Sequence, residues 1–309
     1  MTSGISSHSS DSMGQVLATL RVEGAVLSIA HVEAPFAVTS GRPGTGVFHA
    51  VLRGEAWAAT ASGPAVRLEP GRVAVLPSGA EHVISSAVEP DVKPVPVTVD
   101  DAGALPAMRV ANGGALTEVL CGTITFEESP AMSITAALPE MVVTGSDTSA
   151  GWVQSTVALV ADELGQALSA SEVVAARLAD VLVVRALREM VWDGVGHGWA
   201  AGVRDPAIGR SLALIHGDPA GVGSVADLAR AASMSRSLFY ERFSRVVGVS
   251  SGEYAARWRI HVACGLLRKT SQPVSSIARG VGFRAEAGFS TAFKRLVGVP
   301  PSAYRRQVR

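Results

Sequence analysis

The chain has few cysteines and no long apolar run. Its 309 residues include only Cys121 and Cys264, and no apolar stretch approaches the ~18 residues that a membrane span requires. Met1 to Ser12 are polar and Ser-rich, without the basic and apolar stretches of a secretory signal. Two distant cysteines in such a chain indicate free thiols in a reducing compartment. We therefore expect a cytoplasmic protein with no membrane partner.

Catalytic motifs are also scarce. The glycine-rich stretches 44–46 and 217–223 lack the Lys-Ser/Thr pair and the strand–helix context of a phosphate-binding loop, so both predict turns. No Ser-His-Asp or paired-carboxylate spacing stands out. These motifs give no reason to expect an enzyme.

The formal net charge is zero, but the charges are unevenly distributed. Residues 203–309 contain 17 Lys and Arg against 6 Asp and Glu, a net charge of +11. Residues 1–202 carry the opposite balance, −11. A basic module fused to an acidic one favours a polyanion as the partner of the basic half, although a solvated charged face would give the same count.

The acidic half begins with short alternating runs that predict strands over residues 15–126. Runs such as 47–52 and 73–76 are separated by Gly, Pro and Ser turns, which is typical of a sandwich or barrel. Residues 90–114 are rich in Pro, Gly and Asp and predict a loop.

Two helices are predicted next, over about 152–168 and 172–192. On the second helix, Val174, Leu178 and Val181 recur at helical spacing. This apolar face is either part of the core or the seam of a dimer, and the sequence leaves both interpretations open.

A flexible linker is predicted at residues 194–202, where four glycines alternate with other residues. Asp205-Pro206 then predicts the start of a helix, because Asp is a favoured N-cap and Pro a favoured first helical residue.

The C-terminal hundred residues contain an internal repeat. Residues 225–230 (Val-Ala-Asp-Leu-Ala-Arg) match 274–279 (Val-Ser-Ser-Ile-Ala-Arg) at an offset of 49. Residues 239–254 match 289–304 at an offset of 50, sharing two Phe, a Val-Gly-Val and a Tyr. One residue is therefore inserted in the second copy, beside Gly282.

Each copy predicts a helix, a tight turn and a second helix, and a helix over 253–267 joins the copies. In the first copy Ser235 ends the turn and can cap the next helix. That helix has a buried stripe of Phe239, Phe243 and Val247, and its counterpart has Phe289, Phe293 and Leu296.

The opposite face of each second helix is polar and basic, as entry into a major groove requires. We therefore expect DNA contacts from Arg236, Ser237, Tyr240 and Glu241 in the first copy, and from Arg284, Glu286, Ala287, Ser290, Thr291, Lys294 and Arg295 in the second. Of these, Lys294 and Arg295 are expected to reach phosphate. Glu241 is expected either to accept from cytosine N4 or to pair with Arg245.

These residues resemble the AraC/XylS family of bacterial transcription regulators. The resemblance is carried by Leu228-Ala229, Met234-Ser235-Arg236-Ser237 and Phe243 in the first copy, and by Ile277-Ala278, Val281-Gly282-Phe283, Phe289-Ser290, Ala292-Phe293-Lys294-Arg295, Gly298-Val299-Pro300-Pro301 and Tyr304-Arg305 in the second. It covers about residues 205–307 and implies two recognition helices in successive major grooves on one face of the DNA.

The chain departs from the family pattern at four positions. Glu241 and Thr291 stand where the family usually or often has Arg, and Ala285 replaces a frequent Ser or Asp cap. Gly288 lies inside the second recognition helix, at a cost of about 1 kcal/mol relative to Ala. The second copy is therefore expected to read sequence less strictly than the first.

The acidic half resembles the cupin-type sensor found at the N-terminus of some of these regulators. Residues 71–82, which end at His82, are similar to the second cupin motif. The first motif would need two His one residue apart and a later Glu, but the chain has only His49, with Val51 at the other position. Enzymatic cupins hold a redox metal with three His and one Glu, so the broken set argues against a cupin oxygenase or isomerase.

A metal site is still one interpretation of the barrel. His49, His82 and Cys121 all lie on strand-like segments, and alternation allows them to converge. A soft Cys with two His suits Zn²⁺. The other interpretation is two hydrogen-bonded core histidines and a small buried thiol. Cys264 is expected to belong to the core.

The sequence thus predicts a multidomain α+β protein. Its expected parts are a disordered tail (1–14), a cupin-like sensor barrel (15–150), a helical pair and linker (151–202), and a double helix-turn-helix domain (203–309). The expected function is a sequence-specific transcription regulator, a homodimer that responds to a small molecule or metal and contacts RNA polymerase if it activates. The alternatives are a metal-dependent cupin enzyme with an accessory helical domain, and an architectural DNA-binding protein whose barrel only dimerises.

Overall fold

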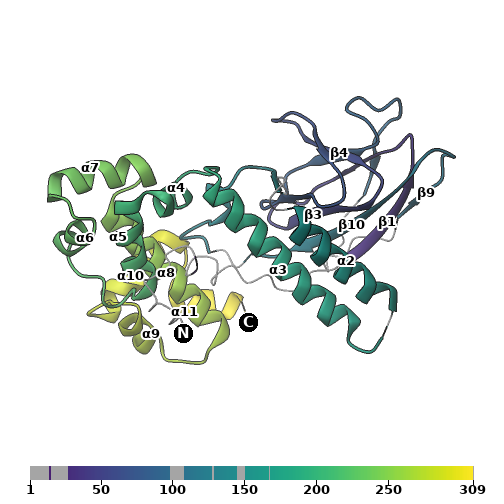
Figure 1. The fold of residues 1–309 in the computed structure, drawn as a ribbon. Helices are drawn as coiled ribbons and strands as arrows, with labels where there is room; N and C mark the ends of the chain where they lie inside the picture. The colour runs from purple at the N-terminus through teal and green to yellow at the C-terminus, as the bar shows by residue number, and fades with distance from the viewer. Residues whose placement is uncertain are drawn as a thin grey trace, which may run out of the picture. The chain divides into compact units, whose positions relative to one another are not determined.

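The computed structural model describes residues 14, 27–97, 108–126, 129–144, 150–166 and 168–308, which belong to two compact units (Figure 1). One unit lies within residues 21–126 and 138–193, and the other within 1–20, 127–137 and 194–309. Across the described residues, no helix combines the length and the apolar composition needed to cross a membrane.

The first unit is built on two β-sheets, which confirms the β-rich half expected from the sequence. The six-stranded sheet has the order β11-β6-β3-β10-β1-β9, and the five-stranded sheet has the order β5-β4-β7-β2-β8. The strands are β1 (Leu27–Glu33), β2 (Ala37–Ser40), β3 (Gly46–Arg53), β4 (Ala56–Thr60), β5 (Val66–Leu68), β6 (Val73–Leu76), β7 (His82–Ser85), β8 (Val95–Pro96), β9 (Arg109–Val110), β10 (Leu116–Ile124) and β11 (Val142–Thr144).

The register of the strands brings polar residues from distant parts of the sequence together inside this unit. In the antiparallel pair β3–β10, His49 lies opposite Cys121, and in β2–β7, Ser40 lies opposite His82. Directly opposed residues share a face of the sheet, so each pair is in side-chain contact range. An apolar core that includes Phe36, Leu68 and Ile84 lies beside them.

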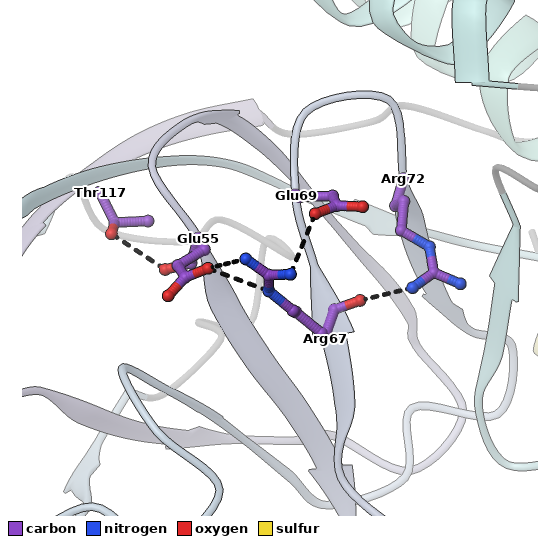
Figure 2. A network of polar contacts seen from close by, with 5 residues as sticks. All are labelled: Glu55, Arg67, Glu69, Arg72 and Thr117. Atoms are coloured by element: carbon purple, nitrogen blue, oxygen red, sulfur yellow. Dashed lines mark hydrogen bonds and ion pairs between the residues drawn. The ribbon is translucent and has the colours of Figure 1, made fainter. Parts of the chain in front are cut away.

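Figure 2 shows a polar network around the β4–β5 hairpin. The Arg67 guanidinium donates to Glu55 and lies 3.5 Å from Glu69, while Arg72 Nη1 donates to the Arg67 carbonyl (2.9 Å). Thr117 Oγ1, on β10 of the other sheet, donates to the Glu55 carbonyl (3.0 Å). Because the Glu55–Arg67 pair is half exposed, it contributes little to the stability of the fold.

Two helices complete the first unit, α2 (Ala150–Gln166) and α3 (Ser171–Trp192), close to the predicted bounds. They pack on each other, and α3 also packs on β11, β1 and β6. Trp152 Nε1 donates to Glu189 Oε1 (2.7 Å), and the Arg185 guanidinium lies 4.2 Å from the centre of the Trp152 ring. These side-chain contacts join the two helices, and the packing of α3 on β11, β1 and β6 holds the hairpin on the sheet.

The second unit is helical. Its helices are α4 (Trp199–Arg204), α5 (Pro206–Gly217), α6 (Val225–Ala231), α7 (Arg236–Val247), α8 (Ser251–Lys269), α9 (Val274–Gly280), α10 (Glu286–Val297) and α11 (Pro301–Gln307). Asp205 is the N-cap of α5, as predicted, since its side chain accepts from the N–H groups of Ala207 (3.0 Å) and Ile208 (3.1 Å).

The prediction of a flexible linker over residues 194–202 is wrong for the second half of that range. Residues 199–204 form α4, and Trp199 is 3% exposed. The indole N–H of Trp199 donates to the carbonyl of Ile134 (3.0 Å), sixty-five positions earlier in the chain. The glycines indicated a linker locally, but a buried long-range contact orders the segment.

Ile134, which accepts this hydrogen bond, is one of residues 129–137. These residues lie between β10 and β11 in sequence but pack within the helical unit. They include a short 3-10 helix, η1 (Thr135–Ala137). Ala131 joins the core around α8, α9 and α10, and the Ser129 hydroxyl is 3.0 Å from Nδ1 of the buried His261 on α8. The helical unit is therefore assembled from two separate stretches of the chain.

Candidate nucleic-acid interface and sensor cavity

The first helix-turn-helix copy is formed by α6 and α7. A capping box starts α6, because the Ser224 N–H donates to Asp227 Oδ2 (2.7 Å) and the two side chains also bond. Ser235 caps α7 by accepting from the Leu238 N–H, as predicted. Gly248, with φ +85°, ends α7 in the left-handed conformation that glycine favours.

The two faces of α7 divide as the sequence predicted. Phe239, Phe243 and Val247 are buried, with the two Phe rings 5.5 Å apart. The predicted DNA-contacting residues of this copy are all exposed: Arg236, Ser237, Tyr240 and Glu241. Glu241 Oε1 lies 3.9 Å from Arg245 Nη1 one turn later, which is the intrahelical alternative considered for that carboxylate.

Two arginines that no local sequence pattern indicated hold this copy in place. Arg242, on α7, pairs with the N-cap carboxylate of Asp205, at 2.9 Å from Nε and 2.8 Å from Nη2. Arg210, on α5, donates to the carbonyls of Ala231 (2.8 Å) and Ala232 (3.2 Å), at the end of α6. Helix α5 therefore fixes both helices of the first copy.

The Asp205 carboxyl is adapted to this role. Burial raises its pKa, but the N–H groups of Ile208 and Ala207 and the Arg242 guanidinium outweigh that effect and lower the pKa below its usual value. The side chain is 13% exposed, so its charge is held by its partners more than by water.

The second copy is formed by α9 and α10, and both helices lack a side-chain cap at the N-terminus. The N-cap of α9 is Pro273 and that of α10 is Ala285, and neither makes a side-chain cap bond. Phe289 and Phe293 are buried as predicted, whereas Leu296 is only half buried.

The outer face of α10 and its preceding turn carry the predicted contacts of the second copy. Its exposed members are Arg284, Glu286, Ala287, Thr291, Lys294 and Arg295. Ser290 is half buried, because it directly follows the buried Phe289 on the edge of the core face.

In the β-rich unit, the three proposed ligand residues lie together. His49 Nδ1 is 3.2 Å from Cys121 Sγ, and His49 Nε2 is 2.8 Å from His82 Nε2. The other ring nitrogen of His82, Nδ1, is 2.8 Å from the carbonyl of Ala80, and Ser40 Oγ is 3.1 Å from His82 Nε2. The result is a continuous chain of hydrogen bonds across both sheets.

The backbone carbonyl fixes the direction of this chain. A carbonyl only accepts, so His82 carries its proton on Nδ1 and accepts at Nε2. His49 Nε2–H then donates to His82, and His49 Nδ1 accepts from the Cys121 thiol. Every member of this Cys121–His49–His82 relay is uncharged.

The environment favours these uncharged forms. Burial, together with the neighbouring His82, lowers the pKa of His49 well below 6.5, and burial also lowers the pKa of His82. Burial raises the pKa of the Cys121 thiol to about 12. Near neutral pH both imidazoles and the thiol are therefore neutral.

This arrangement does not fit a single Zn²⁺ ion. Cys121 contacts Nδ1 of the His49 ring and His82 contacts Nε2. One ion cannot bind both nitrogens of one imidazole. Two nitrogens sharing a tetrahedral Zn²⁺ would lie about 3.3 Å apart, from bonds of about 2.0 Å, whereas His49 and His82 are 2.8 Å apart. Within the described residues no group of three or more His, Cys, Asp or Glu side chains is arranged to hold a metal.

A small cavity of about 50 Å³ adjoins the relay in the same unit. Its walls are mostly apolar, with four polar side chains and no charged one among the described lining residues. The lining residues are Ser28, Ala30, Val32, Phe36, Val38, Ser40, His49, Ile84, Val97, Met108, Val119 and Cys121. The polar groups are provided by strands β1, β2, β3 and β10, so both sheets contribute to the cavity.

Two known protein families match this chain. A cupin family profile matches residues 11–191, and a helix-turn-helix domain profile matches residues 228–307. The first match covers the β-rich unit with α2 and most of α3, and the second begins within α6 and ends at the end of α11. Helix α5, which carries Asp205 and Arg210 at and near its start, lies outside both matches.

The chain is also similar to several regulators. An AraC-like transcription regulator of Streptomyces lividans is 36% identical over 222 residues, which are 71% of this chain and 73% of that protein. One from Streptomyces antibioticus is 41% identical over 157 residues, 50% of this chain and 52% of that protein. The crystal structure of the DNA-binding domain of AdpA, in complex with a target DNA, is 28% identical, and the match covers 34% of this chain and 94% of that chain with a TM-score of 0.33.

Proposed function

This chain belongs to the family of AraC-like transcription regulators, and on that premise we propose that α7 and α10 are recognition helices that enter successive major grooves of promoter DNA. The observation that carries the proposal is the division of faces on both helices. Each buries two phenylalanines and exposes a polar and basic side on a unit whose residues 203–309 have a net charge of +11.

The exposed residues are assigned different roles. Arg236, Ser237 and Tyr240 lie at and near the start of α7, where a recognition helix meets base edges. In the second copy, the base-facing residues are Arg284, Glu286, Ala287, Ser290 and Thr291. Lys294 and Arg295 lie in the last turn of α10 and are assigned to phosphate.

Binding to a selected DNA site tests these roles. Arg236→Ala should weaken binding by roughly 1–3 kcal/mol and relax the preference at one base pair, if Arg236 reads a base. Lys294→Ala should weaken all sequences about equally and reduce the salt slope by about one unit. Arg188→Ala is a matched control, since it removes an exposed arginine from α3, outside the helical unit. Unchanged affinity and preference in both test variants would contradict the assignment.

For the β-rich unit we propose that the cavity beside the relay receives a small, uncharged effector. Supporting this are the small volume, the apolar walls and the neutral polar groups of Ser40, His49 and Cys121. Transfer of a carboxylate or an ammonium group into such a cavity without an ionic partner would be strongly unfavourable. The effector would hydrogen-bond to the relay and change the affinity of the protein for DNA.

A pair of probes of equal size tests this proposal. In DNA-binding titrations, acetamide should change the affinity of the wild type, whereas acetate at the same concentration and ionic strength should not. Ala30→Leu fills part of the cavity and should abolish the response. Ala59→Leu, on a half-buried position of β4 outside the cavity, should keep it. Equal responses to both probes, or a response that survives in Ala30→Leu, would refute an uncharged-effector site.

We further propose that the exposed face of α3 forms a homodimer. Val174 and Val181 are 44% and 56% exposed and lie two turns apart with half-buried Leu178 between them. A second copy of the same face would cover these side chains. Sedimentation should show a dimer that Val181→Glu converts to a monomer. Val173→Glu, 61% exposed but off this stripe, should remain dimeric.

A regulator of this kind acts where promoter DNA is, so the proposed compartment is the cytoplasm, and RNA polymerase is a further partner if the chain activates transcription. The relatives that match most of this chain's length are described as transcription regulators, which favours regulation over the alternative of a cupin enzyme.

A further inference from the structure

The turn of the second helix-turn-helix copy, which contains the inserted residue, contacts the loop that leads into the first copy. The insertion lies in the turn between α9 and α10, where Gly282 has a φ of +90°. A Cβ atom on Gly282 would lie 2.9 Å from the Cα of Ala220 and 3.0 Å from the carbonyl oxygen of Pro219. The turn of the second copy thus contacts the backbone of the loop between α5 and α6, residues 218–224, which leads into the first copy.

The same loop is held from a second direction by the helix that joins the copies. Arg259, on α8, donates from Nε to the Pro219 carbonyl (2.8 Å) and from Nη2 to the Val222 carbonyl (3.3 Å). The guanidinium is partly buried, and burial lowers its pKa, so its hydrogen bonds to the loop replace contacts with water.

The loop also has rigid ends. Asp218 Oδ1 accepts from the Gly221 N–H (2.9 Å), which closes a tight turn at its start. The capping box of Ser224 and Asp227 fixes its end to α6. A displacement of the loop relative to α8 would therefore be transmitted to the start of α6 rather than absorbed within the loop.

We propose that loop 218–224, Arg259 and Gly282 form a clamp that fixes the distance and angle between α7 and α10, and thereby selects the spacing between two half-sites in DNA. This inference rests on the proposed entry of both helices into the grooves. Without the clamp, loop 218–224 would no longer tie the start of the first copy to α8 and to the turn of the second copy. Adding one base pair between half-sites displaces the second by about 3.4 Å and rotates it by about a tenth of a turn, so a rigid pair of helices discriminates spacing.

The test compares duplexes in which the selected half-sites are at their preferred spacing, one base pair closer or one base pair further apart. The wild type should bind the altered duplexes at least tenfold more weakly. Arg259→Gln should bind the preferred duplex several-fold more weakly, and its affinities for the three duplexes should agree within threefold. Arg257→Gln is the matched control, because it removes the same charge two positions away on α8, where the arginine pairs with Glu253 of the same helix.

A second variant keeps the clamp testable if Arg259→Gln does not fold. Gly282→Ala places a Cβ against Ala220 and should also flatten the spacing preference. Helicity and thermal unfolding of each variant are checked by circular dichroism. A wild-type spacing profile in a folded Arg259→Gln or Gly282→Ala protein would overturn the clamp. Failure of the groove-entry proposal is distinguishable, because Arg236→Ala and Lys294→Ala would then leave binding to every duplex unchanged.

Discussion

Replacement of Asp205 by alanine should lower the free energy of unfolding by about 2–3 kcal/mol. The carboxylate caps α5 through two backbone N–H groups, and loss of such a cap costs about 1 kcal/mol. It also accepts a hydrogen bond from Nε of Arg242 on α7 and forms an ion pair with Nη2, and a hydrogen bond to a charged group contributes about 1.5–3 kcal/mol. Because the Arg242 side chain is 37% exposed, its guanidinium can bind water in the variant, and we take the lower part of that range.

Replacement of Asp205 by asparagine separates the contribution of the cap from that of the pair with Arg242. Asp205→Asn keeps an oxygen that can cap α5 but removes the charge that faces Arg242, so it should cost only about 1–1.5 kcal/mol. Urea unfolding of Asp205→Asn, Arg242→Met and the double variant forms a double-mutant cycle. We expect a coupling of about 1 kcal/mol between the two positions. Additive costs in this cycle would refute the idea that α5 and α7 are joined by this pair.

The same pair gives a direction for the pH dependence. The pKa of Asp205 is lowered on folding, so its contribution is fully present above the ordinary carboxyl pKa of about 4 and is lost as the pH falls through the lower folded value. The difference in stability between wild type and Asp205→Asn should therefore be constant from neutral pH down to about pH 5 and shrink in stronger acid. A difference that grows on acidification would contradict the pairing.

Three further predictions concern other contacts. Burial raises the pKa of Cys121 and of Cys264 to about 12, so a thiol reagent at pH 8 should label neither in the folded protein and both in denaturant; fast labelling of the native protein would contradict the raised pKa values. Ser235→Ala should destabilise the helical unit by about 1 kcal/mol in chemical unfolding, whereas Ala285→Ser should stabilise it by about 0.5–1 kcal/mol, since α7 has a side-chain cap and α10 has none; equal effects of the two changes would contradict this difference. Trp199→Phe keeps most of the buried ring but leaves the Ile134 carbonyl without its donor, so we expect a cost of about 1–3 kcal/mol, measured by thermal unfolding against Trp192→Phe, whose side chain is 63% exposed.

Local patterns in the sequence were sufficient for much of the helical unit. The repeat, the Phe239 and Phe243 stripe and the cap at Ser235 all depend on residues within a few positions of one another, and the structure confirms them. Alternation also placed His49 and Cys121 on faces that could meet, because side chains in a strand point alternately to its two sides.

Contacts between distant residues could not be predicted in this way. Arg242 counted only as one more positive charge, because its partner Asp205 lies thirty-seven positions away. The insertion beside Gly282 was visible in the repeat, but the contact of Gly282 with loop 218–224 depends on how α8 arranges the two copies. The sequence identified His49, His82 and Cys121 but not the order of their hydrogen bonds, which depends on the Ala80 carbonyl.

The docking of residues 129–137 within the helical unit limits how regulators of this kind can be recombined. A hybrid made by joining residues 194–309 to an unrelated sensor would inherit His261 without the Ser129 hydroxyl, Trp199 without the Ile134 carbonyl, and a core lacking Ala131. The DNA-binding half therefore cannot be transferred intact as a continuous segment that starts at residue 194. Exchange of sensors, in the laboratory or during evolution, has to preserve a short piece of the donor chain that is encoded upstream of α2.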